Sequence, residues 1–144
     1  MSIREPASVR ALVTGSSSGI GEAIARRLLH DGWNVVGYDR APPRIAAPNF
    51  EAVTVDLADA PALSKALAAE RNIKAVVHAA GFMRVALLGE LDLNQGADMW
   101  RLHVQAAALV ADALAPRLPV GGRIVLIGSR TATGAAGRSQ YAAT

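Results

Sequence analysis

Short apolar runs alternate with longer stretches of helical periodicity along this chain. The longer stretches place apolar side chains three and four positions apart, which predicts helices at residues 19–30, 59–71 and 94–115. The short runs suit strands that are covered on both faces, and they lie at 11–14, 34–38, 52–55, 75–78 and 123–127. Strands that alternate with helices pair in parallel, so the pattern predicts an α/β fold with a doubly wound sheet of about five strands in the order 3-2-1-4-5.

The composition is typical of one globular domain over residues 1–144. The chain is 51% hydrophobic and 19% charged, which is enough apolar surface for a buried core. It has no cysteine, so disulfides, a thiol nucleophile and a cysteine-ligated metal are excluded. We expect no bound metal ion.

The N-terminal residues and the charge distribution argue against membrane and nucleic-acid partners. The first residues, MSIREPASVR, carry charge and proline without an apolar run, and no later stretch reaches the length of a membrane span. The sequence therefore predicts a cytoplasmic protein that does not bind membranes. The net charge of +3 comes from scattered basic residues without interleaved aromatics, so we expect no nucleic-acid binding.

A glycine-rich turn, TGSSSGIG, follows the first predicted strand and opens the first predicted helix. Glycine allows positive φ and close approach of a ligand, while the free N–H groups and the dipole of a helix start attract a phosphate. The turn lacks the Gly-Lys-Ser/Thr ending of a P-loop, so a dinucleotide fits better than a nucleoside triphosphate. The residues predicted to hold it are Gly15, Ser17, Ser18, Gly19, Ile20 and Gly21.

Two charged residues, Asp39 and Arg40, follow the second predicted strand. A carboxylate at this place accepts hydrogen bonds from the adenosine ribose and repels a 2′-phosphate, so Asp39 favours NAD over NADP. Arg40 could instead bind that phosphate, or it could simply face solvent. The sequence leaves both roles of Arg40 open.

The stretch TGSSSGIG resembles the cofactor loop of the short-chain dehydrogenase/reductase family. The resemblance covers the whole chain but only the N-terminal part of the family, so it implies a Rossmann-like sheet that is incomplete at its C-terminal side. It also implies an NAD(P)-dependent oxidoreductase that interconverts an alcohol and a carbonyl of a small-molecule substrate by hydride transfer. NADP-using members often place a basic residue where Ser18 stands here, which again favours NAD.

The resemblance implies further cofactor contacts after the third and fourth strands. Asp56 and Leu57 stand on the adenine side, and Ala80 and Gly81 stand at the nicotinamide-side ribose. The family usually has two asparagines just before the second of these pairs, and both are replaced here, which leaves backbone contacts but removes a side-chain brace. We expect His78, at the first replaced position, to be packed at a strand end rather than to carry a proton.

The catalytic residues that the resemblance implies are a serine, a tyrosine and a lysine. Ser129 matches the serine that orients the substrate oxygen, Tyr141 matches the acid/base, and the lysine would follow directly after Thr144. A tyrosine titrates near ~10 unless a cation lowers its pKa, so we expect the 144-residue chain alone to be essentially inactive. The family's asparagine in the central helix aligns with Gln105, whose supporting role stays open.

Other functions remain open from the sequence: a catalytically silent nucleotide-binding module, and an inactive fragment of a longer enzyme. Taken alone, Ser129 is equally consistent with a loop serine that caps local backbone. Should the chain prove active, His78 and His103 are the first alternative proton carriers. A fifth strand that is last in the sheet would expose an apolar edge, which favours a fragment or a partner. The family pairs its central helices across subunits, which implies a homo-oligomer through residues 94–115.

Overall fold

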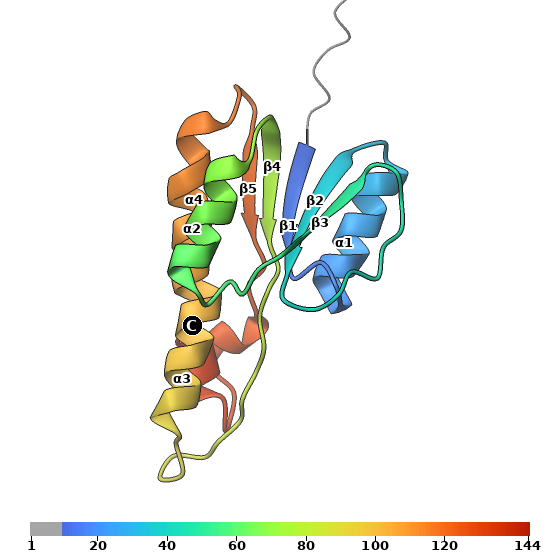
Figure 1. The fold of residues 1–144 in the computed structure, drawn as a ribbon. Helices are drawn as coiled ribbons and strands as arrows, with labels where there is room; N and C mark the ends of the chain where they lie inside the picture. Colours follow the sequence, from blue (N-terminus) through green and yellow to red (C-terminus); the bar gives the residue numbers. More distant parts are fainter. Residues whose placement is uncertain (1–9) are drawn as a thin grey trace, which may run out of the picture.

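A sheet of five parallel strands organises the described residues, 10–144, in the computed structural model (Figure 1). The strands are β1 (Arg10–Thr14), β2 (Asn34–Asp39), β3 (Phe50–Thr54), β4 (Ile73–His78) and β5 (Arg123–Leu126). Their order is β3-β2-β1-β4-β5, which confirms the α/β fold and the strand order predicted from the sequence. The prediction that residues 1–9 carry no targeting segment lies outside the described residues.

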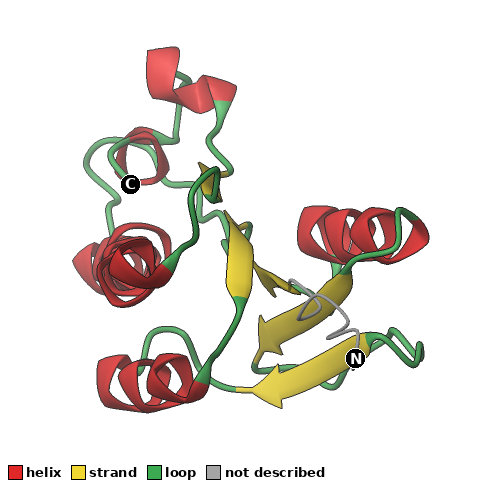
Figure 2. Ribbon diagram, turned by 90° about the horizontal axis from the view of Figure 1, so that it is seen from above, coloured by secondary structure: helices red, strands yellow, loops and turns green. Residues whose placement is uncertain are grey.

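Helices cover both faces of this sheet. One face carries α1 (Gly19–His30), and the other carries α2 (Ala60–Ala69) and α4 (Ala106–Leu114) side by side (Figures 1 and 2). The chain between β4 and α4 reaches past the carboxyl ends of the strands and includes α3 (Leu93–Trp100). The shorter elements are η1 (Arg101–Gln105), η2 (Ala115–Arg117), η3 (Arg130–Thr133) and α5 (Ser139–Ala142).

The core consists of two apolar layers, one on each face of the sheet. Successive side chains of a strand point to opposite faces. In β1, Ala11 and Val13 pack in the layer that contains Ala25 of α1, whereas Leu12 packs in the layer that contains Leu63 of α2. Both layers are buried over the inner strands, which is why β1, β2 and β4 have nearly continuous apolar runs rather than alternating ones.

The helix predicted over residues 94–115 is interrupted. A π-helical turn, η1, joins α3 to α4. Within it, the Leu102 carbonyl oxygen lies 3.1 Å from Nε2 of His78. This bond to a strand residue gives the carbonyl a partner outside the helix, which stabilises a departure from the regular ladder. Single π turns are frequent at functional sites, and hydrophobic spacing does not reveal them.

The two ends of the sheet differ slightly from the sequence prediction. β3 begins at Phe50 rather than at residue 52, and β5 ends at Leu126 rather than at residue 127, although the Ile127 N–H still donates to the His78 carbonyl at 3.0 Å. β5 lies at the sheet edge, where Val125 and Leu126 are 45% and 59% exposed. The predicted exposed apolar edge is therefore present.

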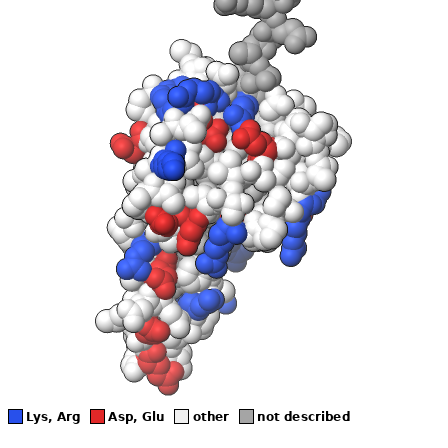
Figure 3. Space-filling model, viewed as in Figure 1, with Lys and Arg blue, Asp and Glu red and all other residues white. Residues whose placement is uncertain are grey.

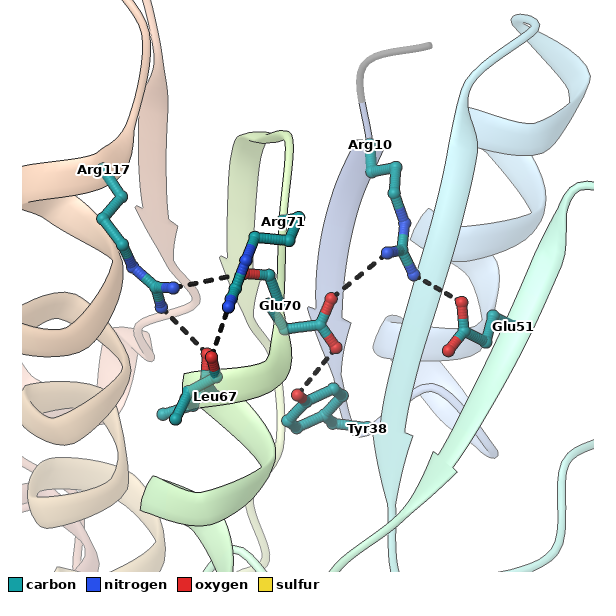
Figure 4. Close-up of polar contacts among 8 residues, drawn as sticks. Arg10, Tyr38, Glu51, Leu67, Glu70, Arg71 and Arg117 are labelled. Atoms are coloured by element: carbon teal, nitrogen blue, oxygen red, sulfur yellow. Dashed lines mark hydrogen bonds and ion pairs between the residues drawn. The ribbon is translucent and has the colours of Figure 1, made fainter. Parts of the chain in front are cut away.

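A buried carboxylate, Glu70, joins side chains of β1, β2 and β3 on one side of the sheet (Figure 4). It accepts the Tyr38 hydroxyl proton at 2.8 Å and lies 3.4 Å from the Arg10 guanidinium, which also contacts Glu51. Burial and the hydrogen bond to Glu70 raise the pKa of Tyr38 well above its ordinary value. This network fastens the end of α2 to the start of β1 through Arg10 and to the carboxyl half of β2 through the Tyr38 ring.

Charged side chains of both signs lie over the face shown in Figure 3, where the basic groups are separated by acidic ones. This agrees with the dispersed charge predicted from the sequence. Among residues 10–144, no helix is both long and apolar enough to cross a membrane.

Candidate active site

A cleft of about 890 Å³ opens at the carboxyl ends of β1, β2, β3 and β4. Crevices at this end of a parallel sheet are where such folds bind ligands. The cleft contains all of the predicted cofactor residues except Ser17 and Gly21, namely Gly15, Ser18, Gly19, Ile20, Asp39, Arg40, Asp56, Leu57, Ala80 and Gly81. The structure therefore brings together residues from four separate segments of the chain.

The glycine turn has the geometry that an anion site needs. Gly15 and Gly19 have φ values of +71° and +53°, in the left-handed region that favours glycine. A Cβ on Gly15 would lie 2.8 Å from Cα of Ala80, so this position also requires the missing side chain for close packing. Ser18, the N-cap of α1, makes no side-chain capping bond in the described chain, which leaves the first N–H groups of the helix directed at the cleft.

The two predicted residues that do not line the cleft shape the turn from behind. Ser17 is buried, and its hydroxyl donates to the Ala41 carbonyl at 3.2 Å. Gly21 packs against the Gly15 backbone, where any side chain would overlap that carbonyl. Neither residue offers a side chain to the cleft. Their contacts with Ala41 and Gly15 instead fix the shape of the turn.

Asp39 is fixed at the wall of the cleft by backbone donors. Its Oδ2 accepts the Ser17 N–H at 3.0 Å, and its Oδ1 accepts the Ala41 N–H at 2.9 Å. Each oxygen retains acceptor capacity, so the carboxylate can also accept ribose hydroxyls. Arg40 is exposed beside it and lines the same cleft.

Thr14, at the end of β1, connects the glycine turn to the loop after β4. Its hydroxyl oxygen accepts the N–H groups of Ala79 and Ala80, each at 3.1 Å, and its proton is then free to reach Nδ1 of His78 at 2.9 Å. The other His78 nitrogen donates to the Leu102 carbonyl. Burial lowers the pKa of His78. His78 is thus a packed, neutral residue with both nitrogens bonded, as the sequence predicts.

The three predicted catalytic residues lie outside the walls of this cleft. Ser129 is exposed and caps η3, where its oxygen accepts the Thr131 N–H at 3.2 Å and lies 2.8 Å from the Thr131 hydroxyl. Tyr141 is half-buried in α5, which packs beside η3 and α3. The Gln140 side chain ties α5 to the start of α3 by donating to the Asp92 carbonyl at 3.0 Å.

The residue of the central helix that contacts Tyr141 is His103. Their ring centroids are 5.6 Å apart in an edge-to-face arrangement with an interplanar angle of 89°. Gln105 lies two positions further along the same turn, and residues two apart on a helix point to different sides. Gln105 therefore does not share the face of η1 that meets the tyrosine. Its supporting role stays a prediction.

Further cleft residues were missed from the sequence. Phe82 and Arg84 line the cleft beyond Gly81, and the Arg84 guanidinium lies 4.9 Å from the Phe82 ring centroid. Gln95 and Asp98 of α3 line the opposite wall. Their only sequence signal is their position after the fourth strand, because the direction of this segment is set by tertiary packing.

A glycine turn between a strand and a helix, an acid after the second strand and a cleft at the carboxyl ends of parallel strands define a dinucleotide-binding α/β protein. This chain belongs to the short chain dehydrogenase family, whose model matches residues 9–144. The resemblance seen in the sequence is thus confirmed at the level of the family.

Among its relatives, the chain is similar to serine 3-dehydrogenase of Agrobacterium fabrum, with 39% identity over 80 residues that cover 49% of this chain and 32% of the relative. It also resembles the crystal structure of a short-chain dehydrogenase from Streptomyces avermitilis, with a TM-score of 0.88 and 28% identity over 96% of this chain and 56% of that one. A blue fluorescent protein from a metagenomic library, solved in complex with NADPH, gives a TM-score of 0.81 and 29% identity over 94% of this chain and 62% of that one. The chain thus spans from about a third to somewhat under two thirds of these proteins.

Proposed function

We propose that this protein is an NAD(P)-dependent oxidoreductase that interconverts an alcohol and a carbonyl of a small-molecule substrate. The observation that carries the proposal is the cleft at the carboxyl ends of β1 to β4, in which the glycine turn faces Asp39 and the Ala80–Gly81 backbone. The NADPH complex of the metagenomic blue fluorescent protein supports it. The absence of cysteine fits the cytoplasmic location that we also propose.

The residues present fit a dinucleotide along the whole cleft. The N-terminus of α1 would hold the pyrophosphate, Asp39 the adenosine ribose, Asp56 and Leu57 the adenine, and Ala80 and Gly81 the second ribose. When bound, the nicotinamide supplies or accepts the hydride. We propose NAD as the preferred form, because the fixed Asp39 carboxylate repels a 2′-phosphate and Ser18 offers no cation to offset it.

Tyr141 and Ser129 are the proposed catalytic residues. The Tyr141 hydroxyl would exchange the proton with the substrate oxygen, and the Ser129 hydroxyl would orient that oxygen. A phenol acts at neutral pH only beside a cation, and the family resemblance places this cation on the residue after Thr144. Gln105 would act only at a distance, because it does not share the face of η1 that meets Tyr141.

Two measurements test this function. Fluorescence titration of the chain with NADH and NADPH should show binding in the micromolar range or tighter, about −8 kcal/mol. The full gene product should then oxidise at least one member of an alcohol panel that includes L-serine, followed at the reduced-nicotinamide absorbance band. Failure to bind either nucleotide would refute the proposal.

Variants assign the roles within the active site. Tyr141→Phe in the full gene product should lower kcat by about 10²–10⁴ and leave NADH binding unchanged, because only the proton carrier is lost. Ser129→Ala should also lower kcat, whereas Ser64→Ala on the exposed side of α2 serves as the matched control. Unchanged kcat in Tyr141→Phe would exclude Tyr141 as the acid/base.

A second candidate function is a nucleotide-binding module without turnover. It is favoured by one observation: the Ser129 hydroxyl is engaged with Thr131 outside the cleft rather than directed into it. For this function the full gene product should bind NADH but reduce or oxidise nothing in the panel. Ser129→Ala should then leave NADH affinity unchanged.

We also propose that the central helix region, residues 94–115, pairs with a second copy of the chain. Trp100 of α3 is 48% exposed and Leu93 at its start is 75% exposed, so apolar surface is available there. Light scattering after size exclusion should give the mass of a dimer or tetramer. Trp100→Glu should shift it towards the monomer, and an unchanged monomeric mass in both proteins would refute the proposal.

A further inference from the structure

His103 uses both of its ring nitrogens to join segments that are far apart in the chain. Nε2 lies 3.0 Å from the backbone nitrogen of Phe82, in the loop after β4. Nδ1 lies 2.8 Å from the Thr144 hydroxyl oxygen, just beyond α5. The ring thus connects the wall of the nucleotide cleft with the segment that carries Tyr141.

These contacts select one protonation state. A backbone N–H can only donate, so Nε2 of His103 must be without a proton, and Nδ1 must carry it. Nδ1–H then donates to the Thr144 oxygen, which leaves the Thr144 proton to reach the Tyr141 carbonyl at 3.0 Å. All three hydrogen bonds are satisfied by the neutral Nδ1–H tautomer. Burial lowers the pKa of His103, which also favours the neutral ring.

The same ring makes three packing contacts. It meets Tyr141 edge-to-face at 5.6 Å and Phe82 at 5.9 Å with an interplanar angle of 62°. On a third side, a Cβ on Gly81 would lie 3.1 Å from Nε2, so the imidazole packs directly on the backbone of the cofactor loop. The imidazole thus contacts both the Tyr141 ring and the loop after β4.

Tertiary contacts hold the segment of Tyr141 on two sides. The Gln140 side chain donates to the Asp92 carbonyl at 3.0 Å, which joins α5 to the start of α3. On another side, His103 contacts the Tyr141 ring and the Thr144 hydroxyl. Because the same imidazole also packs on Gly81, it is placed to set the position of the Tyr141 ring relative to the cleft.

We propose that His103 is a positioning residue that fixes the Tyr141 ring relative to the Gly81–Phe82 segment of the nucleotide cleft. This inference rests on the proposed function, in which Tyr141 exchanges a proton with the substrate beside the nicotinamide. It assigns the supporting role in the central helix to His103, acting through aromatic contact and two hydrogen bonds.

The first test does not depend on activity. Long-range ¹H–¹⁵N correlation spectra of the 144-residue chain near neutral pH should show His103 as the Nδ1–H tautomer, and cross-relaxation should connect its ring protons with those of Tyr141. A predominant Nε2–H tautomer would overturn the inference, because Nε2 could not then accept the Phe82 N–H. Absence of the cross-relaxation would overturn it as well.

The second test separates positioning from folding, in the full gene product. His103→Leu should lower kcat roughly 10- to 100-fold, since misplacement of a reacting group by about 1 Å costs on this order. Its NADH dissociation constant should stay within about threefold of wild type, because the bonds that fix Asp39 and the glycine turn, which hold the adenosine ribose and pyrophosphate in the proposed function, do not involve His103. His103→Gln, whose side-chain oxygen can accept the Phe82 N–H, should recover part of kcat. His30→Gln, on the exposed side of α1, is the matched control.

Each kinetic outcome either supports or overturns the positioning role of His103. Unchanged kcat in His103→Leu would overturn the inference, and so would a parallel loss of kcat, NADH affinity and melting temperature, which is the signature of a merely structural residue. If the wild-type gene product has no turnover at all, the proposed function fails instead. The tautomer and cross-relaxation measurements on the chain then decide the position of His103 by themselves.

Discussion

The Asp39 carboxylate accepts the backbone N–H of Ser17 at 3.0 Å, so a negative charge is held at the rim of the glycine turn. A second backbone donor, from Ala41, fixes its other oxygen. The orientation of the carboxylate is therefore set by the protein before any nucleotide arrives, and the exposed Arg40 stands next to it.

The first prediction concerns the choice between nucleotides. Wild type should bind NADH more tightly than NADPH, and Asp39→Asn should weaken NADH about tenfold, because a charged acceptor of the ribose hydroxyls becomes neutral. Fluorescence titration measures both. Arg40→Ala is the companion variant: a preference for NADPH in wild type that Arg40→Ala removes would assign the choice to Arg40 instead.

The second prediction concerns the glycine turn. Gly15→Ala should destabilise the fold by more than Gly32→Ala, although both glycines have positive φ, at +71° and +85°. Gly32→Ala should cost only about 1 kcal/mol of unfolding free energy, because nothing lies within 4 Å of the added carbon. At Gly15 the added carbon overlaps Ala80, which adds about 1–3 kcal/mol. Urea denaturation compares them, and equal losses would contradict the close packing of the two loops.

The third prediction concerns the buried Glu70 network. Tyr38→Phe should lower the free energy of unfolding by about 1–3 kcal/mol, because it removes a buried hydrogen bond to a charged group. NADH affinity should stay within about threefold of wild type, because the Tyr38 backbone, whose carbonyl accepts the Gly15 N–H at 2.8 Å, is not altered. Glu51→Gln, which alters the exposed partner of Arg10, should cost at most about 1 kcal/mol. Equal losses in the two variants would contradict the stabilising role of the buried Tyr38–Glu70 hydrogen bond.

The fourth prediction concerns the pH dependence of stability. Burial lowers the pKa of His78 below its ordinary value of 6.5, so below that pH the unfolded chain takes up a proton more readily than the folded one. The contribution of neutral His78 to the free energy of unfolding is complete above pH 6.5. It is lost as the pH falls towards the pKa of His78 in the folded protein. Urea midpoints at pH ~7.5 and ~5.5 should therefore differ less in His78→Gln than in wild type. The pKa of His103 is also lowered by burial, so part of the pH dependence of stability remains in the variant. An identical slope in the variant would contradict the burial of His78.

Part of the nucleotide cleft could be predicted from the sequence. The glycine turn and Asp39 follow from local rules, glycine where φ is positive and an acid directly after a strand, whereas the residues after β3 and β4 came from the family resemblance. Phe82, Arg84 and the α3 residues of the cleft had no such signal. Parallel pairing then brings all strand ends to one edge without further information. The same rules gave the strand order and the approximate helix bounds.

The surroundings of Tyr141 were decided only by the tertiary structure. The apolar spacing of residues 94–115 did not reveal the π turn, which shifts the helical phase, so the sequence did not show which side chain of that helix faces the tyrosine. The bond between His78 and the Leu102 carbonyl supports the turn, and it joins residues 24 positions apart. The sequence by itself therefore determined the sheet and its nucleotide edge, because these follow from local conformation and strand pairing. The packing of α5 against η1 determined that His103 contacts Tyr141, because that contact depends on the helical phase set by a long-range hydrogen bond.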